Sequence, residues 1–398
     1  MQKIFGYERD PYLQELEVRI ESTGEEEGLP FAILDDTVLY PEGGGQPADH
    51  GWLSAVAVMD VRRSGDEIRH ILERGVGGDD GHLALDWERR YDHMQQHTAQ
   101  HLLTSLGLSR FGWSTRSFHI GSEVSDIELD CKPPTGKEIE ALEDAVAQIV
   151  GEARWIRCYR VSRDQYAQLE VRSRGLPAGH SGDIRLVEIE GIDRNTCGGT
   201  HVRSTAEVGA VKVVRSEPIR GGCRLYWVAG KRTRQRLAYH ETRLGELRSL
   251  LDTADEGLVS VAQLKLEQIG DGRRTIRQLE DRLAASLAEA LLTDSAEVTD
   301  LHLEGSEATL LRRVAEIYAE KSAHGLALLT AEDAGGVLFA VAAGSTNKVD
   351  LQEVGRQVAK LFEGRGGGAG RVFQGKASSV EQRAAALDYL RQALAKPN

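Results

Sequence analysis

Two short motifs, HTAQH at residues 97–101 and CGGTH at residues 197–201, constrain this chain more than any other feature. In the first motif, two histidines lie four residues apart in a predicted helix, so both rings share one helix face and can chelate a divalent metal ion. In the second, a cysteine and a histidine are also four apart, and the intervening glycines suit a tight loop. Together the motifs supply a ligand set that favours zinc by softness and number: His97, His101, Cys197 and His201.

Each motif alone is weak evidence for a metal, because two histidines four apart on a helix are more often surface or core residues. Both motifs within one α+β domain make a zinc site the favoured interpretation. Four protein ligands normally close a tetrahedral structural site, whereas a catalytic zinc keeps one position open for water or substrate. The residues therefore leave open whether the zinc is structural or catalytic.

The overall composition is that of a multidomain protein able to bury hydrophobic cores. The 398 residues are 40% hydrophobic and 28% charged, and at about 150 residues per domain they predict two to four domains. No run approaches the ~18 apolar residues of a membrane helix, and the N-terminal MQKIFGYERD lacks the basic and apolar regions of a signal peptide. Four cysteines cannot form a disulfide framework, so we expect a reducing, cytoplasmic location and no membrane partner.

The charge balance limits how nucleic acid can be bound. With 49 Lys and Arg against 62 Asp and Glu, the formal net charge is −13. Non-specific binding of nucleic acid needs clustered basic side chains, so this acidic total argues against it. A local basic patch on an otherwise acidic protein is still compatible with selective binding of one RNA.

Periodicity predicts an N-terminal β domain over residues 1–90. The segments LEVRIEST, FAILDDTVLY and GWLSAVAVMDVRR have the patterns of strands, and glycine- or aspartate-rich breaks follow them. Closely spaced strands with short turns are typical of a small β-barrel or a sandwich.

Residues 91–230 predict an α+β domain that holds both metal-ligand motifs. A helical pattern begins at Asp92, strand-like SFHIGSEVSDIELDC follows, and a second helix spans residues 135–151. In that helix Thr135 precedes Glu138 by three residues, as in a capping box. Strands and turns fill the rest of the domain.

The remainder of the chain predicts a helical spacer and an α/β domain. Residues 231–295 carry almost no strand signal, and leucines and isoleucines recur every three, four or seven residues on both sides of a break at residues 270–272. An antiparallel hairpin or short coiled coil is the simplest interpretation, with a plain amphipathic helix on a neighbouring core as the alternative. In residues 296–398, the apolar runs GLALLT and GVLFAVAAG predict buried strands, with helices near residues 351–361 and 379–395.

The motifs and their order resemble those of a known family. HTAQHLL with DRNTCGGTHV is similar to the HxxxH…CxxxH signature of the alanyl-tRNA synthetase editing domain and of its free-standing relatives, the AlaX proteins; the threonyl-tRNA synthetase editing domain shares this fold. LYPEGGGQP at residues 39–47 resembles the family's N-terminal glycine-rich segment, and GGGAGR at residues 366–371 resembles the glycine motif of the DHHA1 domain. In order, these parts cover nearly the whole chain and match the long form of AlaX: barrel, editing domain, helical spacer and DHHA1-like domain.

The resemblance implies a trans-editing hydrolase that cleaves the ester between alanine tRNA and a wrong amino acid, serine or glycine. It maps the family's zinc ligands onto His97, His101, Cys197 and His201. Nothing in the sequence resembles a class II aminoacylation domain or its ATP motifs, so we expect the protein to clear aminoacyl-tRNA but not to make it. The resemblance also implies tRNA contact and homodimer formation through the C-terminal region.

The expected reaction requires little from the protein. An aminoacyl ester is already activated, so its hydrolysis needs a positioned water and charge stabilisation at the carbonyl. Zinc could lower the pKa of bound water, polarise the carbonyl, or bind the free α-amine and only orient the ester. If all four side chains bind the metal, the orienting role becomes more plausible.

By the resemblance, the N-terminal glycine turn covers the amino-acid pocket. Gly43, Gly44 and Gly45 allow close backbone approach to a ligand, and Thr37 and Gln46 flank them. Ordinary strand-end and turn roles are the alternative for these residues. Because alanine is smaller than serine, size cannot exclude it, and a hydrogen-bonding group for the serine hydroxyl is expected. The candidates for that group are Thr98, Thr115 and Thr200.

Two residues near the motifs carry further hypotheses. His93 lies four residues before His97 and either supports a ligand or is simply exposed. Asp193, just before the CGGTH loop, either orients a ligand imidazole or forms a turn.

The second glycine cluster, at residues 364–370, has two interpretations. Backbone N–H groups of a glycine-rich loop before a basic residue can hold phosphate or an RNA backbone, or the glycines merely allow a tight turn. With the DHHA1 resemblance, the tRNA-binding candidates are Gly366, Gly367, Gly368, Gly370 and Arg371. Arginines scattered through the helical spacer support this binding, or they belong to a solvated helix face.

Two rival functions stand beside the hydrolase. A tRNA-binding or scaffold protein whose zinc is purely structural would share the motifs but not the hydrolysis. A DHHA1-linked phosphoesterase would need Asp/His metal clusters such as DHH, and the sequence has none.

Overall fold

The computed structural model describes residues 3–65, 67–172, 182–304, 308–333 and 336–395. The chain divides into two compact units, residues 1–246 and residues 247–398. Within the described ranges, no helix is both long and apolar enough to cross a membrane. The domain boundaries expected at residues 90, 230 and 295 stay predictions.

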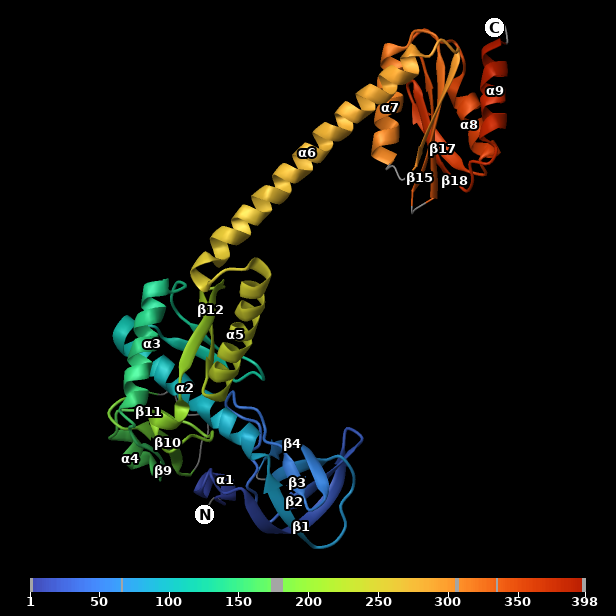
Figure 1. Cartoon of the computed structure of the whole chain (residues 1–398). Coiled ribbons are helices and arrows are strands. Elements are labelled where there is room, and N and C mark those ends of the chain that lie inside the picture. Colours follow the sequence, from blue (N-terminus) through green and yellow to red (C-terminus); the bar gives the residue numbers. More distant parts are fainter. Residues whose placement is uncertain (1–2, 66, 173–181, 305–307, 334–335, 396–398) are drawn as a thin grey trace. The chain divides into compact units, whose positions relative to one another are not determined.

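Six strands of the first unit close into a barrel (Figure 1). In the order β1-β2-β5-β4-β3-β6 they are β1 (Glu15–Glu26), β2 (Leu29–Leu34), β5 (Glu67–Leu72), β4 (Val56–Ser64), β3 (Gly51–Leu53) and β6 (Asp80–Leu85). Inward side chains such as Leu53, Val58 and Leu83 are buried. The closed barrel confirms one of the two predicted architectures and excludes the sandwich. A short helix, α1 (Gly6–Arg9), precedes the strands.

Two segments predicted as strands differ in detail. FAILDDTVLY is extended only to Leu34, because Asp36 turns the chain: its Oδ1 accepts hydrogen bonds from the backbone N–H groups of Gly6 and Thr37, both at 2.8 Å. GWLSAVAVMDVRR folds as the β3–β4 hairpin, with Ser54 in the left-handed conformation at φ 55°.

A long helix, α2 (Trp87–Phe111), organises the α+β part of the first unit. Asp86 caps its N-terminus by accepting a hydrogen bond from the backbone N–H of Arg89 at 3.2 Å. The helix therefore begins before Asp92, where the sequence pattern placed its start. Every residue from 93 to 107 is buried, so α2 contacts neighbours on all sides.

Two antiparallel sheets share a hydrophobic core with α2 and α3 (Gly136–Gly151). One sheet has the order β12-β13-β8-β7 and the other β11-β10-β9. Their strands are β7 (Thr115–His119), β8 (Ser125–Leu129), β9 (Ile156–Val161), β10 (Ile184–Ile189), β11 (Asp193–Thr196), β12 (Val211–Ile219) and β13 (Gly222–Ala229). The predicted capping box of α3 is confirmed, because Thr135 and Glu138 bond each other's backbone N–H. A short helix, α4 (Arg163–Ala167), follows β9.

Helices α5 (Lys231–Leu251) and α6 (Leu258–Thr293) form the predicted helical segment. The break predicted at residues 270–272 is wrong, because α6 runs through both glycines. An exposed glycine weakens a helix by only about 1 kcal/mol relative to alanine, which a 36-residue helix tolerates. The chain breaks instead at residues 252–257, where Asp252 has φ 50°. Because the boundary between the units falls near the end of α5, the helical hairpin stays a prediction.

The second unit is built on a five-stranded mixed sheet. In the order β14-β15-β16-β18-β17, its strands are β14 (Val298–Glu304), β15 (Leu326–Asp333), β16 (Gly336–Ala343), β18 (Val372–Ala377) and β17 (Arg365–Ala369). The end of α6 and α7 (Ala308–Lys321) cover one face, and α8 (Leu351–Leu361) and α9 (Arg383–Ala395) cover the other (Figure 1). The buried strands and α8 confirm their predictions, and the multidomain α+β fold class is confirmed with them.

The C-terminal glycine cluster forms a strand, which neither sequence interpretation expected. β17 pairs antiparallel with β18, so Gly366 lies opposite Gly375. A Cβ on Gly366 or Gly368 would lie 2.5 or 2.2 Å from a carbonyl oxygen of β18, so a side chain does not fit at either position. Gly370, at φ 69°, occupies the turn between the two strands.

Candidate metal centre

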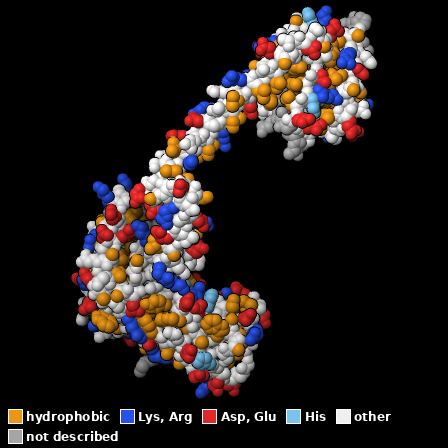
Figure 2. Space-filling model, in the orientation of Figure 1, with side chains coloured by type: hydrophobic (Ala, Val, Ile, Leu, Met, Phe, Trp, Pro, Cys, Tyr) orange, Lys and Arg blue, Asp and Glu red, His pale blue; other side chains and the backbone are white. Residues whose placement is uncertain are grey.

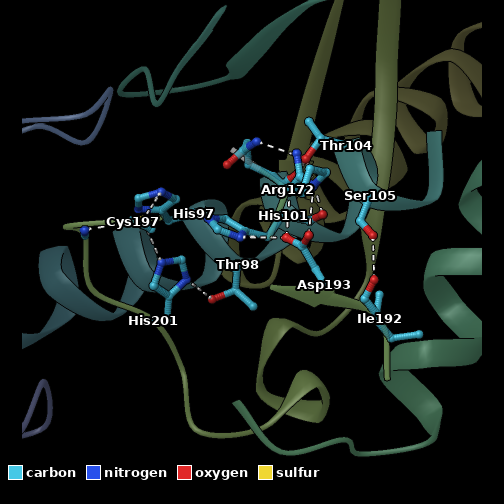
Figure 3. Close-up of polar contacts among 12 residues, drawn as sticks. His97, Thr98, His101, Thr104, Ser105, Arg172, Ile192, Asp193, Cys197 and His201 are labelled. Atoms are coloured by element: carbon cyan, nitrogen blue, oxygen red, sulfur yellow. Dashed lines mark hydrogen bonds and ion pairs between the residues drawn. The ribbon is translucent and has the colours of Figure 1, made fainter. Parts of the chain in front are cut away.

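Helix α2 and the loop after β11 bring four potential metal ligands together (Figure 3). His97 and His101 come from α2, and Cys197 and His201 come from the CGGTH loop. The ligand atoms of all four lie within 4.8 Å of one another. Cys197 Sγ is 3.4 Å from His97 Nε2 and 3.3 Å from His201 Nε2. The structure thus joins the two sequence motifs at one point, in a group that could hold a metal ion.

The second nitrogen of each imidazole contacts a different side chain. The Nδ1 contacts are His97 with Gln46 Oε1 at 2.8 Å, His101 with Asp193 Oδ2 at 3.1 Å, and His201 with Thr98 Oγ1 at 3.1 Å. A ligating histidine usually donates its other N–H to an oxygen acceptor of this kind, which sets the ring orientation. These contacts leave Nε2 of each ring for the metal. The donor set therefore fits a divalent ion that prefers nitrogen and sulfur ligands.

Burial and mutual contacts set the protonation of the four groups. Burial raises the pKa of the Cys197 thiol, but the imidazoles of His97 and His201 outweigh it and hold that pKa well below its usual range. Burial lowers the pKa of His201 to about 3, and His97 adds to the effect. Burial also lowers the pKa of His101, but Asp193 and Cys197 outweigh it and raise the pKa to about 9. The thiolate, which is the metal-binding form of cysteine, is therefore favoured at neutral pH.

Asp193 links this cluster to an arginine that the motifs do not reveal. Arg172 donates from Nε to Asp193 Oδ1 at 2.8 Å and from Nη2 to Oδ2 at 2.6 Å. Burial raises the pKa of Asp193, but Arg172 and His101 outweigh it and leave that pKa lowered. The carboxylate stays charged beside His101, so of the two hypotheses for Asp193 the geometry favours orientation of the imidazole. No local sequence pattern could have identified Arg172.

The glycine-rich turn of the barrel reaches the cluster through Gln46. Its Oε1 contacts His97 and also accepts a hydrogen bond from the backbone N–H of Thr200 at 3.0 Å, while its Nε2 donates to Thr200 Oγ1 at 2.9 Å. Gly44 and Gly45 have φ of 57° and 84°, and Gly43 pairs with Gln46 across the turn. These left-handed positions let a barrel segment place the Gln46 amide against His97, a candidate metal ligand.

Thr37, expected beside Gln46 in the pocket, lies inside the barrel instead. Its hydroxyl is 2.8 Å from His70 Nε2 and accepts a hydrogen bond from the backbone N–H of Leu39 at 3.0 Å. It does not belong to the lining of the cavity at the cluster. Of the two roles expected for Thr37, these contacts favour the structural one over a place in the pocket.

A cavity of about 490 Å³ opens beside the cluster. Three of the candidate ligands, His97, His101 and Cys197, line it together with Gly45 and Phe118. A Cβ on Gly45 would lie 2.8 Å from the Phe118 ring, so this wall requires glycine. The candidate metal position is therefore accessible to a ligand that enters the cavity.

The polar groups of the cavity separate the threonine candidates. Thr98 and Thr200 line the ligand cluster, but their hydroxyls already contact His201 and Gln46. Thr115 and Gln100 line the cavity, and among the described residues neither Thr115 Oγ1 nor Gln100 Oε1 has a hydrogen-bond partner. The sequence motifs did not identify Gln100 as a candidate, although it lies within HTAQH and lines the cavity together with His97 and His101.

His93 is neither exposed nor part of the cavity lining. It is 3% exposed, and burial lowers its pKa to about 3, with Arg89 and Arg232 adding to the effect. Of the two hypotheses for this residue, exposure is wrong.

The C-terminal candidates for tRNA contact belong to the β17–β18 hairpin of the second unit. Arg371 donates from Nη1 to the backbone oxygen of Asn347 at 2.6 Å and from Nη2 to that of Ser345 at 2.7 Å. Its guanidinium therefore holds a neighbouring loop, and contact of this hairpin with tRNA stays a prediction.

Family models match two parts of the chain, and relatives align over most of it. Two family models match: "Threonyl and Alanyl tRNA synthetase second additional domain" over residues 184–226 and the DHHA1 domain over residues 298–396. The alanyl-tRNA editing protein Aarsd1 of Danio rerio is 35% identical over 407 residues, covering 96% of this chain and 95% of that protein. Aarsd1 of Mus musculus is 34% identical, covering 90% and 87%. The alanine–tRNA ligase of Ignicoccus hospitalis is 31% identical over 92% of this chain but only 40% of the ligase.

Proposed function

The chain belongs to the family of alanyl-tRNA editing proteins, and we propose that it is a trans-editing hydrolase that removes serine or glycine from mischarged tRNA(Ala). One observation carries the proposal: a thiolate and three oriented imidazoles stand beside a cavity that reaches three of them. An aminoacyl end of tRNA that entered this cavity would place its ester next to the metal ligands.

Zinc is the proposed metal. Cys197 Sγ and the Nε2 atoms of His97, His101 and His201 would hold it, in a four-ligand set of sulfur and nitrogen that zinc prefers. When bound, zinc supplies a Lewis acid that polarises a carbonyl or a water molecule, or a cation that orients the substrate's amine. Gln46, Asp193 and Thr98 keep the imidazole rings in place through their Nδ1 contacts.

Recognition of serine is proposed for Gln100 and Thr115. Both line the cavity with an oxygen that has no protein partner in the described part of the chain, so a serine hydroxyl could satisfy one of them. Correct alanine has no hydroxyl and would leave these groups unpaired, which is a stronger basis for rejection than size. This argument favours serine over glycine as the main substrate.

A non-catalytic tRNA-binding protein with a structural zinc is the second candidate. The observation in its favour is the ligand count, because four protein ligands normally complete a tetrahedral structural site. The cavity against the same ligands favours the hydrolase, since a purely structural site needs no access for a substrate.

The deciding experiment measures deacylation of Ser-, Gly- and Ala-tRNA(Ala) by the purified chain. We expect rapid release of serine, slower release of glycine and retention of alanine. Cys197→Ala should lower turnover by ~100-fold or more, since even residues that support metal ligands contribute 10- to 100-fold, and should leave tRNA affinity intact. Cys131→Ala, a cysteine change outside the ligand group, is the matched control. If the wild-type protein leaves Ser- and Gly-tRNA(Ala) intact, the hydrolase proposal fails and the structural-zinc candidate stands.

We also propose a homodimer formed through the second unit. On α6 the apolar residues Val259, Leu266, Ile269, Ile276 and Leu279 are each more than half exposed. Figure 2 shows hydrophobic side chains between charged ones along this helix. Packing against α6 of a second copy would remove these side chains from water. A monomeric mass by light scattering at micromolar concentration would refute the dimer.

A further inference from the structure

The second unit contains a cavity of about 690 Å³ that lies outside the candidate metal centre, which belongs to the first unit. Residues of α6, α7 and strands β16, β17 and β18 line it. One side is apolar, with Leu310 and Leu311 of α7 and Leu338 of β16. The volume lies in the range of small-molecule sites, about 300–1,000 Å³.

Two cations of this cavity face the same way from neighbouring strands. Arg365 of β17 lies directly opposite Lys376 of β18, and Lys376 lies opposite Leu338 of β16. Leu338 packs in the core that α7 shares with the sheet, and residues paired across antiparallel strands share a face. Both cations therefore project on the side of the sheet covered by α6 and α7.

This pair is electrostatically unfavourable without an anion. Like charges directly opposite each other on antiparallel strands destabilise the pairing. Arg277 of α6 lines the same cavity, and in the described ranges no ion pair involves Arg277, Arg365 or Lys376. An anion held between them would relieve the repulsion.

The remaining charges of the cavity are mostly matched. Arg312 Nε is 2.8 Å from Glu316 Oε1, and Arg313 Nε is 3.2 Å from Asp281 Oδ1. Glu280 is the further carboxylate of the lining, so three unpaired cations face one carboxylate. Ala308 and Thr309, the first residues of the 14-residue helix α7, also line the cavity, and a helix N-terminus adds a partial positive charge.

We propose that this cavity binds a small phosphorylated ligand of the nucleotide class. A phosphate accepts charge-assisted hydrogen bonds from arginine and lysine, and arginine can bind two of its oxygens at once. The apolar side formed by Leu310, Leu311 and Leu338 suits a base, and Glu280 can accept hydrogen bonds from ribose hydroxyls. A cavity of this volume with one apolar wall suits a single nucleotide better than an extended RNA backbone, which needs a basic groove along its length. This site is independent of the proposed editing reaction.

The test uses the full chain and isothermal titration with AMP, ATP and inorganic phosphate. We expect AMP or ATP to bind with micromolar affinity and inorganic phosphate more weakly. Arg365→Gln and Lys376→Gln, made separately, should each weaken nucleotide binding about 10- to 100-fold, the effect of losing a hydrogen bond to a charged group. The control Arg391→Gln, an exposed arginine of α9, should bind as the wild type does. Thermal unfolding of each variant establishes that the unit is folded.

Three results would overturn the proposal. The first is no nucleotide binding up to millimolar concentration in the wild-type protein. The second is equal binding of inorganic phosphate and AMP, which would show that the apolar side contributes nothing. The third is binding of tRNA, but not of nucleotides, that Arg365→Gln weakens, which would make the cavity part of an RNA-binding surface. Because none of these titrations measures deacylation, the outcome is separate from that of the editing assay.

Discussion

Glycines cluster twice in this chain, at residues 43–45 of the barrel and at residues 364–370 of the second unit. In the first cluster, Gly44 and Gly45 adopt left-handed φ values and lead directly into Gln46, whose amide contacts His97. In the second, the glycines form strand β17, where a Cβ at Gly366 would meet the backbone of β18.

The difference shows that a glycine cluster says little about function until the reason why each position requires glycine is known. The barrel turn needs glycine because its backbone takes conformations that other residues avoid, and the result is a polar side chain placed in the candidate metal-ligand cluster. Gly366 and Gly368 of strand β17 need to be glycine because the backbone of β18 lies too close for a side chain at either position. The functional potential of this strand therefore lies in the adjacent Arg365 and not in a glycine loop. Four experiments test this contrast.

Metal removal should have the largest effect, and only on the unit that contains the barrel turn. An ion present at ~1,000 times its dissociation constant stabilises the folded state by about 4 kcal/mol. The one His/Cys/Asp/Glu group found in the described ranges lies in the first unit. A chelator should therefore lower the unfolding midpoint of that unit in calorimetry and leave the second unit unchanged. Cys197→Ala should be insensitive to the chelator; equal shifts in both units would contradict the assignment.

Acid should destabilise the barrel through His70 of β5, which contacts Thr37. Burial lowers the pKa of this imidazole to about 4, and its Nε2 contacts the Thr37 hydroxyl while Nδ1 faces the backbone oxygen of Ala32. The folded pKa lies below the unfolded value of 6.5, so the unfolded state takes up the proton first. The contribution of His70 to the free energy of unfolding is fully present above about pH 6.5. It falls by about 3 kcal/mol as the pH drops to about 4.

Calorimetry of the first unit between pH 7 and pH 4.5 measures this loss. The comparison is with His70→Gln, which should lose stability at pH 7 but show a weaker pH dependence. Identical pH profiles for the two proteins would refute the role of His70.

Replacement of Gln46 tests the functional half of the contrast. Gln46→Ala removes the acceptor at His97 Nδ1, and loss of such a partner typically lowers metal affinity or activity 10- to 100-fold. We expect that decrease in zinc affinity and in deacylation of Ser-tRNA(Ala), with the fold retained. Gly367→Ala, in the other glycine cluster, should leave zinc affinity unchanged. Unchanged zinc affinity in Gln46→Ala would remove the turn from the site.

The smallest expected effect is a difference in stability between alanine substitutions at two adjacent glycines of β17, Gly366 and Gly367. Gly366→Ala places a Cβ 2.5 Å from the Gln374 backbone oxygen and should destabilise the second unit by about 1–3 kcal/mol. At Gly367 a Cβ meets nothing within 4 Å, so Gly367→Ala should be neutral or stabilising by up to about 1 kcal/mol. Urea denaturation of the second unit measures both. Equal effects would show that packing against β18 is not the reason for the glycines.

Much of the local structure could be predicted from the sequence. Barrel strands β1 to β4, the capping box of Thr135 and Glu138, the bounds of α8 and the buried strands of the second unit all follow short-range periodicity or spacing. The misses also have local reasons. The glycines in α6 looked like a break because a helix's tolerance of glycine depends on its length, and β17 looked like a loop because glycine carries no strand pattern.

The sequence by itself shows the candidate metal ligands and how they pair. The residue types are those that bind metals, and residues four apart on a helix or in a tight loop lie close together. His97 with His101, and Cys197 with His201, are therefore legible without a structure. The partners that orient these side chains are not, since Gln46 is 51 residues from His97 and Asp193 is 92 residues from His101. Thr37 and Gln46 flank the same turn, yet one bonds inside the barrel and the other reaches the site. The difference between the two residues depends on long-range contacts between the barrel and α2, such as the one between Asp49 and Arg90. No local sequence pattern reveals these contacts.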